Sequence, residues 1–250
     1  MHSDIAYGDN SAQKLDVYQG SKAKDAPIII MVHGGGWHRG DKADTNVVKN
    51  KVAHYLPLGY DVISVNYRLS PQVTPVTEAS DVAAALAYVQ KHATEWAGSA
   101  SKIVMMGHSA GANLVALVAA NPTFAAKASA APWLGTVVLD SAAYNVVQIM
   151  QAKHLALYDP VFGTDQELWQ QSSPTLVLGG KPAPMLLVCS TNRADSCPQA
   201  KAFSIAADAL GTSTSVDPVP LSHGQINAQV GAPGPLTNSI DALLRSLKMP

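Results

Sequence analysis

The sequence predicts a single α/β domain built on a mostly parallel central sheet. Its later apolar runs are nearly continuous rather than alternating, as in strands that are covered by helices on both faces. Runs with helical periodicity alternate with these strands along the chain. The 250 residues suit one α/β domain with a large core, and no internal repeat or low-complexity linker divides them. We therefore expect one domain over residues 1–250, with about eight strands.

The expected elements follow from these runs in chain order. Short strands are expected at 5–7 and 14–19, where they would form an antiparallel edge. The other strands are expected at 27–32, 61–67, 102–106, 135–139, 184–189 and 214–219. Helices are expected at 46–56, 77–96, 110–120, 198–210 and 238–247.

Ser109 lies in the pentapeptide Gly107-His108-Ser109-Ala110-Gly111, between an expected strand and an expected helix. This strand–turn–helix context is what a nucleophile elbow requires, because the flanking glycines permit a sharp turn and a close approach of neighbouring chain. The turn would lift the Ser109 hydroxyl clear of the sheet. His108 is expected to line the elbow and is a candidate substrate-binding residue.

A second motif, His33-Gly34-Gly35-Gly36-Trp37, follows the strand expected at 27–32. Three consecutive glycines allow backbone N–H groups to converge on one point, as stabilisation of a developing oxyanion requires. We expect His33 to brace this loop. Trp37 either contacts the substrate or supports the loop from the core.

Together these motifs resemble those of the α/β-hydrolase superfamily, and in particular its H-G-G-G-W esterases. These comprise the hormone-sensitive-lipase-like, feruloyl-esterase-like and kynurenine-formamidase-like groups, and the resemblance covers nearly the whole chain. It implies an α/β-hydrolase fold and a serine carboxylesterase that works without a cofactor. It also implies an oxyanion hole made by the N–H groups of Gly35, Gly36 and Ala110.

The resemblance implies that the acid and the histidine of a catalytic triad follow the serine in that order. Asp195 lies in the loop after the strand expected at 184–189, where the family keeps its acid, and His223 follows the last strand. We therefore predict Ser109, Asp195 and His223 as the triad. Asp140, which ends the strand expected at 135–139, is the alternative acid in a variant that moves the acid one strand earlier.

Residues 144–180 interrupt the alternation of strands and helices, and we interpret them as a small cap-like insertion near the active site. In similar esterases such a segment often walls the substrate pocket. Ordinary packing of the segment is the alternative. The candidate lining residues in it are Tyr144, Leu157, Phe162 and Trp169.

The two cysteines, Cys189 and Cys197, bracket the loop that carries Asp195. A disulfide closing eight residues is geometrically feasible, and two free thiols are the alternative. Neither Cys-x-x-Cys nor His-Glu-x-x-His spacing occurs, so we expect no metal site.

The net charge of −1 and the scattered basic residues argue against a nucleic-acid partner. No apolar run reaches the length that spans a bilayer, so we expect no membrane span. The resemblance to the esterases implies a small-molecule ester as the partner. The cysteine pair and the low charge favour a periplasmic or secreted protein whose leader is absent from this chain, with a cytoplasmic location as the alternative.

Arg68 is expected to pair with Asp81 or Asp41.

Two other functions remain open from the sequence. An amide hydrolase of the arylformamidase kind would use the same residues, and substrate alone would distinguish it from an esterase. A non-catalytic binding module on the same fold usually lacks the nucleophile, the acid or the base, whereas all three are present here.

Overall fold

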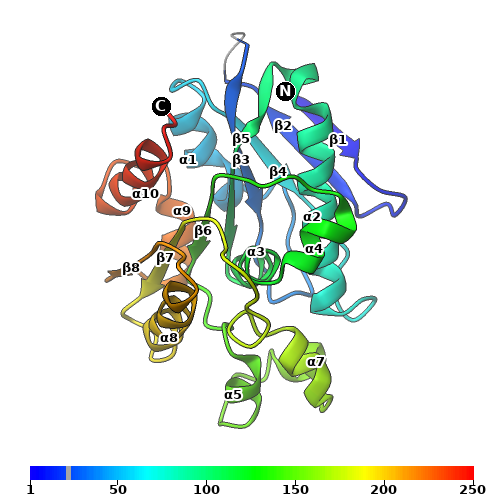
Figure 1. Cartoon of the computed structure of the whole chain (residues 1–250), viewed down its shortest axis with the longest axis vertical. Helices are drawn as coiled ribbons and strands as arrows, with labels where there is room; N and C mark the ends of the chain where they lie inside the picture. Colours follow the sequence, from blue (N-terminus) through cyan, green and yellow to red (C-terminus); the bar gives the residue numbers. More distant parts are fainter. Residues whose placement is uncertain (21–23) are drawn as a thin grey trace.

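The computed structural model describes residues 1–20 and 24–250 and confirms the expected fold class. Within these residues, eight strands form one sheet in the order β1-β2-β4-β3-β5-β6-β7-β8. The first two strands pair antiparallel, and β2 also pairs antiparallel with β4, whereas the pairs from β4 through to β8 are parallel. This is the mostly parallel sheet with an antiparallel edge that the sequence predicts (Figure 1).

The strands are β1 (His2–Ala6), β2 (Lys14–Tyr18), β3 (Ala26–Val32), β4 (Asp61–Val65), β5 (Gly98–His108), β6 (Gly135–Leu139), β7 (Met185–Ser190) and β8 (Thr214–Val219). The helices are α1 (Thr45–Tyr55), α2 (Pro75–His92), the 3-10 helix η1 (Ala93–Trp96), α3 (Ala110–Ala120), α4 (Pro122–Ala128), α5 (Val146–Met150), α6 (Asp159–Phe162), α7 (Gln166–Gln171), α8 (Ser196–Ala209), α9 (His223–Gln229) and α10 (Pro235–Ser246). Strand β5 begins four residues earlier than expected, and α4 and α9 were not predicted.

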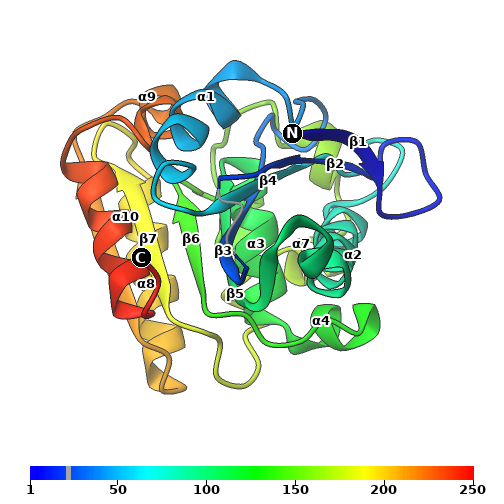
Figure 2. The same ribbon diagram turned by 90° about the horizontal axis from the view of Figure 1, so that it is seen from above.

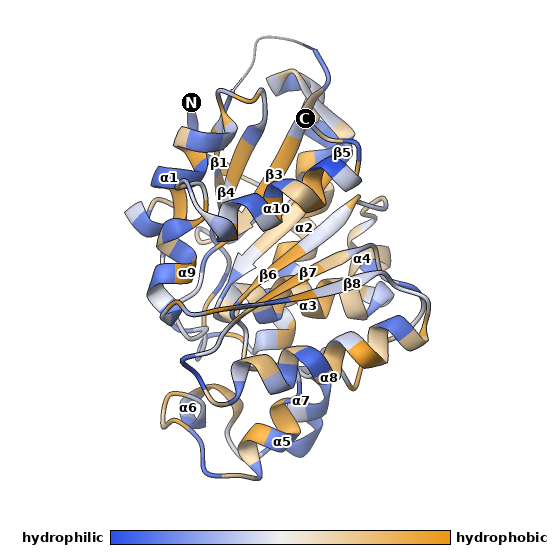
Figure 3. Ribbon diagram, turned by 90° about the vertical axis from the view of Figure 1, so that its left-hand side faces the viewer, coloured by the Kyte–Doolittle hydropathy of each residue, from blue (hydrophilic) through white to orange (hydrophobic). Residues whose placement is uncertain are grey.

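Helices cover both faces of the sheet. On one face, α2, α3 and α8 pack over a large apolar cluster, and on the other, α1, α9 and α10 enclose a smaller one. Figure 2 shows α1, α9 and α10 on one side of the strands and α2 and α3 on the other. Strands β3 to β7 are buried along most of their length, which explains why their sequences are nearly continuous apolar runs (Figure 3).

Helix α3 ties the segment 144–180 to the sheet. Asn113 is fully buried in α3, and its Nδ2 donates to the carbonyl oxygens of Ala143 at 2.7 Å and Ser172 at 3.2 Å. A single buried amide therefore holds both ends of the region that contains α5, α6 and α7. Within residues 1–20 and 24–250, no helix combines the length and the apolar character needed to cross a bilayer.

Candidate active site

Ser109 occupies a strained turn between β5 and α3. Its φ of 57° and ψ of −119° are rare for a residue with a side chain. The glycines on either side leave no room for a Cβ atom. One added at Gly107 would lie 2.2 Å from the carbonyl oxygen of Gly111, and one added at Gly111 would lie 2.3 Å from that of His33. The sequence therefore predicted the elbow and the reason for its glycines correctly.

A second residue with positive φ, Asp140, follows the neighbouring strand β6. Asp140 has φ 56° and directly follows Leu139, which pairs in register with His108. The N–H of Ser109 donates to the carbonyl oxygen of Leu139 at 3.1 Å. The hydroxyl and the carboxylate thus leave adjacent, hydrogen-bonded strands at the same edge of the sheet.

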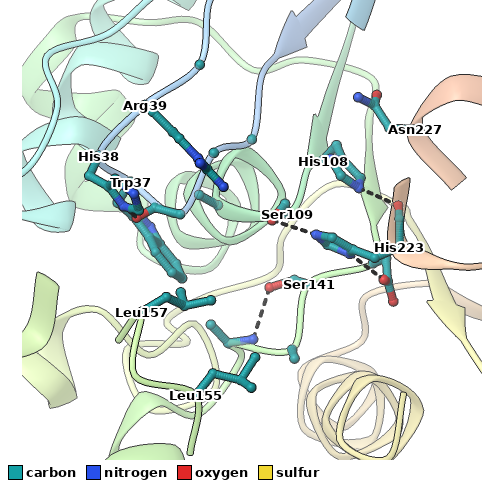
Figure 4. A pocket seen from close by; sticks show the side chains of 18 of the residues that line it. Trp37, His38, Arg39, His108, Ser109, Ser141, Leu155, Leu157, His223 and Asn227 are labelled. Carbon is teal, nitrogen blue, oxygen red and sulfur yellow. Dashed lines mark hydrogen bonds and ion pairs between the residues drawn. The ribbon is translucent and has the colours of Figure 1, made fainter. Parts of the chain in front are cut away.

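His223 joins these two side chains. Its Nε2 lies 2.8 Å from Ser109 Oγ, and its Nδ1 lies 2.6 Å from Asp140 Oδ2 (Figure 4). His223 is the first residue of α9, which begins at a capping box formed by Ser222 and Gln225. A serine, an imidazole and a buried carboxylate in this order can move a proton off the hydroxyl and stabilise the imidazolium that results.

His108 braces the histidine from the other side. Burial and the neighbouring His223 lower the pKa of His108 to about 3, so its imidazole is neutral. The neutral ring donates from Nε2 to the backbone oxygen of His223 at 2.9 Å, and the two ring centroids lie 4.4 Å apart. His108 thus lies at the elbow against His223 and also lines the cavity.

The prediction of Asp195 as the partner of His223 is wrong, because Asp140 occupies that position. Asp195 immediately precedes α8, and its side chain is exposed. From the same loop, Ser196 Oγ donates to Asp140 Oδ1, and Arg193 Nη1 lies 2.8 Å from Asp140 Oδ2. The loop after β7 therefore supplies groups that hold the acid rather than the acid itself.

Asp140 is fully buried, yet its surroundings favour the ionised form. Burial by itself would raise the pKa of Asp140. The hydrogen bonds from His223 and Ser196, the charge of Arg193 and the N–H of Ser190 outweigh burial and hold this pKa well below its usual range.

The glycine loop lies beside the serine. Gly35 and Gly36 have φ values of 123° and 62°, which favour glycine, and a Cβ added at Gly34 would lie 2.7 Å from the Cβ of Ser109. In the part of the chain that the structure describes, no acceptor pairs with the N–H of Gly35 or Gly36, and Ala110 is the first residue of α3. These three N–H groups, expected as an oxyanion hole, are thus free to bind an anionic oxygen.

His33 and Trp37 support this loop. The His33 ring stacks on Tyr67 with centroids 4.5 Å apart, and the Tyr67 hydroxyl donates to the His33 carbonyl oxygen at 2.9 Å. Trp37 is 3% exposed, donates through Nε1 to Asn113 at 3.3 Å and packs edge-on against Phe162. Both contacts match the supporting role, although Trp37 also forms part of the cavity wall.

A cavity of about 710 Å³ opens over Ser109 and His223. Leu155 and Leu157 approach it from the segment 144–180, and Arg39 extends from the glycine loop (Figure 4). Its apolar lining side chains include Trp37, Val47, Leu155, Leu157 and Tyr158, and its polar ones include His38, Arg39, His108, Arg193 and Asn227.

Two of the predicted substrate-binding residues lie in the core instead. Tyr144 is completely buried and stacks on Phe203 with centroids 5.0 Å apart. Trp169 is buried and donates through Nε1 to the carbonyl oxygen of Phe162 at 2.9 Å. The Phe162 ring is buried as well, so of the candidates in this segment only Leu157 reaches the cavity.

Arg68 forms the ion pair with Asp81 that was one of its two expected pairings, at 2.6 Å. Among residues 1–20 and 24–250, no group of three or more histidine, cysteine, aspartate or glutamate side chains could hold a metal ion.

Lys51 anchors α9 from behind the site. This lysine of α1 is 1% exposed, and its Nζ donates to the backbone oxygen of Asn227 at 2.7 Å and to Asn227 Oδ1 at 3.1 Å. Asn227 in turn lines the cavity. This contact was not predicted, because α9 itself was not predicted from the sequence.

Burial lowers the pKa of Lys51 to about 7. At pH values between this pKa and the ordinary lysine pKa of about 10.4, Lys51 is mostly protonated in the unfolded chain and mostly neutral in the folded one. The contribution of Lys51 to stability therefore rises with pH over this range. We expect the free energy of unfolding of the wild type, relative to Lys51→Met, to increase by roughly 2–3 kcal/mol from pH 6.5 to 9.5 in urea titrations. Lys49→Met, on the exposed face of α1, is the control and should show no such change.

Cys189 and Cys197 form a disulfide, with Cα atoms 5.1 Å apart. It joins the end of β7 to the start of α8 and so closes the loop that holds Asp140. Cross-linking a loop of this length removes about 2–3 kcal/mol of entropy from the unfolded chain. Reduction of the wild type should lower the free energy of unfolding by about this amount. Cys189→Ala/Cys197→Ala should be insensitive to the reductant, and an equal stability of oxidised and fully reduced wild type would contradict the expectation.

Known proteins resemble this chain in sequence and in fold. Esterase LipQ of Mycobacterium tuberculosis is 32% identical over 122 residues, which are 47% of this chain and 28% of LipQ. The kynurenine formamidase of Salmo salar is 26% identical over 75% of this chain and 58% of its own length. The chain therefore spans little more than a quarter of the first of these relatives and over half of the second.

Among solved structures, esterase B of Lactobacillus rhamnosis superposes with a TM-score of 0.78 over 99% of this chain and 84% of its own, at 21% identity. This likeness supports the α/β-hydrolase fold. The profile of BD-FAE, an esterase family, matches residues 15–196, which include the glycine loop, Ser109, Asp140 and the loop after β7. Since this match covers well over half of the chain, the protein belongs to the BD-FAE family.

Proposed function

We propose that this protein is a serine carboxylesterase that hydrolyses small carboxylic esters through an acyl-enzyme. The observation that carries the proposal is the chain of contacts from Ser109 Oγ through His223 to Asp140, at 2.8 and 2.6 Å, beneath a cavity. Family membership and the esterase relatives agree with it.

In the first half of the reaction, Ser109 Oγ attacks the ester carbonyl carbon while His223 Nε2 takes its proton. Asp140 accepts the hydrogen bond from Nδ1 and stabilises the imidazolium. The carbonyl oxygen becomes an oxyanion, and the N–H groups of Gly35, Gly36 and Ala110 hold it. Collapse of this intermediate expels the alcohol, to which His223 returns the proton, and leaves the acyl group on Ser109.

Water then repeats these steps on the acyl-enzyme. His223 takes a proton from the water that attacks the acyl carbon, the same N–H groups hold the second oxyanion, and Ser109 leaves as its hydroxyl when His223 returns the proton. The carboxylic acid is released. Every proton that moves is held by a group that the site already contains, so no cofactor is required.

We propose short acyl or aryl esters as the substrates, and the apolar part of the cavity wall suits such groups. Leu157 of its apolar wall is 39% exposed and Leu155 is 59% exposed, although both are large and hydrophobic. An apolar ligand that covers such exposed side chains removes their apolar surface from water, and this favours binding. Trp37 and Tyr158 supply flat surfaces that suit an aromatic group.

The test is hydrolysis of p-nitrophenyl acetate, butyrate and octanoate, with N-formylkynurenine assayed in parallel. We expect turnover of the acetate and butyrate to exceed that of the octanoate, and a fluorophosphonate probe to label Ser109 and block it. Preferential cleavage of N-formylkynurenine would replace the esterase proposal by the amidase one. Folded protein that is neither labelled nor active would contradict both and favour a binding module.

A further inference from the structure

Arg193 is the one cation in direct contact with both Asp140 and His223 among the residues that the structure describes. Its Nη1 lies 2.8 Å from Asp140 Oδ2, 3.0 Å from the Asp140 backbone oxygen and 3.1 Å from His223 Nδ1. The Arg193 side chain is 26% exposed, whereas that of Asp140 is fully buried. The loop that was expected to carry the acid of the triad therefore places a cation beside that acid.

The hydrogen bonds of Asp140 divide between its two oxygens. Oδ1 accepts from the backbone N–H of Ser190 at 2.8 Å and from the hydroxyl of Ser196. Oδ2 faces Arg193 and His223. With Oδ1 held by Ser190 and Ser196, Arg193 fixes Oδ2 beside His223 and supplies the cationic partner of the buried carboxylate.

The contacts of Nη1 also determine which imidazole nitrogen carries the proton. Nη1 has two hydrogens, and the two oxygens of Asp140 in its reach accept both. No hydrogen of Nη1 is left to donate to His223 Nδ1, and the guanidinium cannot accept a hydrogen bond from Nδ1–H. The Nδ1–H group therefore has Asp140 Oδ2 as its acceptor, and Nε2 is left with its lone pair toward the hydroxyl of Ser109.

We propose that Arg193 is a positioning residue, which holds Asp140 ionised and oriented so that His223 keeps its proton on Nδ1 and accepts the Ser109 proton at Nε2. This proposal rests on the proposed esterase function. Arg193 acts through Asp140 and touches none of the reacting atoms. Arg193 lies in the loop between Cys189 and Cys197, so the disulfide closes the loop that carries Arg193.

The experiment compares Arg193→Met and Arg193→Lys with the wild type in full-length protein. We expect Arg193→Met to lower kcat for p-nitrophenyl butyrate about 10- to 100-fold, because small misplacements of catalytic groups cost factors of this size, with KM changed less than about threefold. Arg193→Lys, which keeps the charge, should recover part of kcat. Arg245→Met on the exposed surface of α10 is the matched control and should retain wild-type values.

Proton NMR supplies a readout that a loss of general stability would not mimic. The Nδ1–H of His223 in its hydrogen bond to Asp140 should give a resonance far downfield in the wild type and in Arg245→Met. It should be absent or exchange-broadened in Arg193→Met under conditions where circular dichroism shows a folded chain. Absence of the same resonance from Asp140→Asn assigns it.

Two results would overturn the proposal. One is an Arg193→Met variant that keeps both the resonance and kcat. The other is an unchanged kcat with a raised KM confined to an ester whose acyl group carries a carboxylate, such as mono-p-nitrophenyl glutarate, which would make Arg193 a substrate contact. If the wild type turned over no ester, the proposed function would fail, whereas loss of the resonance in Arg193→Met would still support the role of Arg193 in orienting His223.

Discussion

Replacing Ser109 by alanine is expected to lower kcat for p-nitrophenyl butyrate by about 10⁵- to 10⁶-fold, because it removes the hydroxyl that lies 2.8 Å from His223 Nε2 and forms the acyl-enzyme. The Cβ of alanine occupies the same strained backbone position, and the neighbouring Gly107 and Gly111 are untouched, so the fold should be retained. The free N–H groups of Gly35 and Gly36 would still bind the carbonyl oxygen. KM should therefore change far less than kcat, and the variant should retain affinity for ester analogues.

The measurement is steady-state hydrolysis together with labelling by a fluorophosphonate, followed by mass spectrometry of the intact chain. Ser80→Ala, at an exposed position of α2, serves as the matched serine control and should behave as the wild type. Retention of more than about a hundredth of the wild-type kcat by Ser109→Ala would indicate that another residue is the nucleophile.

Replacing Asp140 by asparagine is expected to lower kcat about 10⁴-fold, whereas Asp195→Asn should leave it within about twofold. An asparagine amide that donates toward Nδ1 favours the imidazole tautomer with its proton on Nε2, which cannot accept the proton of Ser109. Asp195 has no contact with His223, and its side chain is exposed, so the amide there changes neither the tautomer nor the local charge of the imidazole.

Asp140→Asn also leaves Arg193 beside a neutral side chain in a buried position, so thermal unfolding of each variant must accompany the kinetics. The comparison should be made well below the melting temperature of the less stable variant. The reverse result, with Asp195→Asn inactive and Asp140→Asn active, would show that the loop after β7 rearranges to supply the acid in solution.

The fold was predictable because its signals are local. Continuous apolar runs identify the buried strands β3 to β7, and the glycines around Ser109 identify a turn in which no other residue fits. Helix α9 was missed because it is short and lacks an apolar stripe, although the capping box of Ser222 and Gln225 is a local signal that marks its start.

The acid was mispredicted for a reason that spacing alone does not reveal. Asp140 and Asp195 both follow a strand at the carboxyl edge of the sheet, and chain order admits either one. The choice depends on which carboxylate finds partners when buried. The buried Asp140 carboxylate accepts hydrogen bonds from one backbone N–H and from two side chains besides His223. These donors belong to residues fifty or more positions away along the chain.

The lining of the cavity was harder still to predict. Tyr144 and Trp169 are large aromatic residues in the right segment, but they fill the core beneath it, and the smaller Leu155 and Leu157 reach the cavity. Which face of an irregular segment points inward depends on anchors such as Asn113, whose amide holds Ala143 and Ser172 from another helix. Sequence periodicity carries no information about such contacts.

The pairing of β5 with β6 has a consequence for how the enzyme responds to heat. Ser109 and Asp140 follow adjacent strands in the middle of the sheet, and the Ser109 N–H donates to the carbonyl oxygen of Leu139, so the two residues keep their separation as long as the sheet persists. His223 arrives on a helix of seven residues at the surface, and such elements open at lower free energy than central strands. Mild heating should therefore abolish turnover by detaching α9 while the sheet stays folded. Cooling should restore turnover when α9 packs against the sheet again.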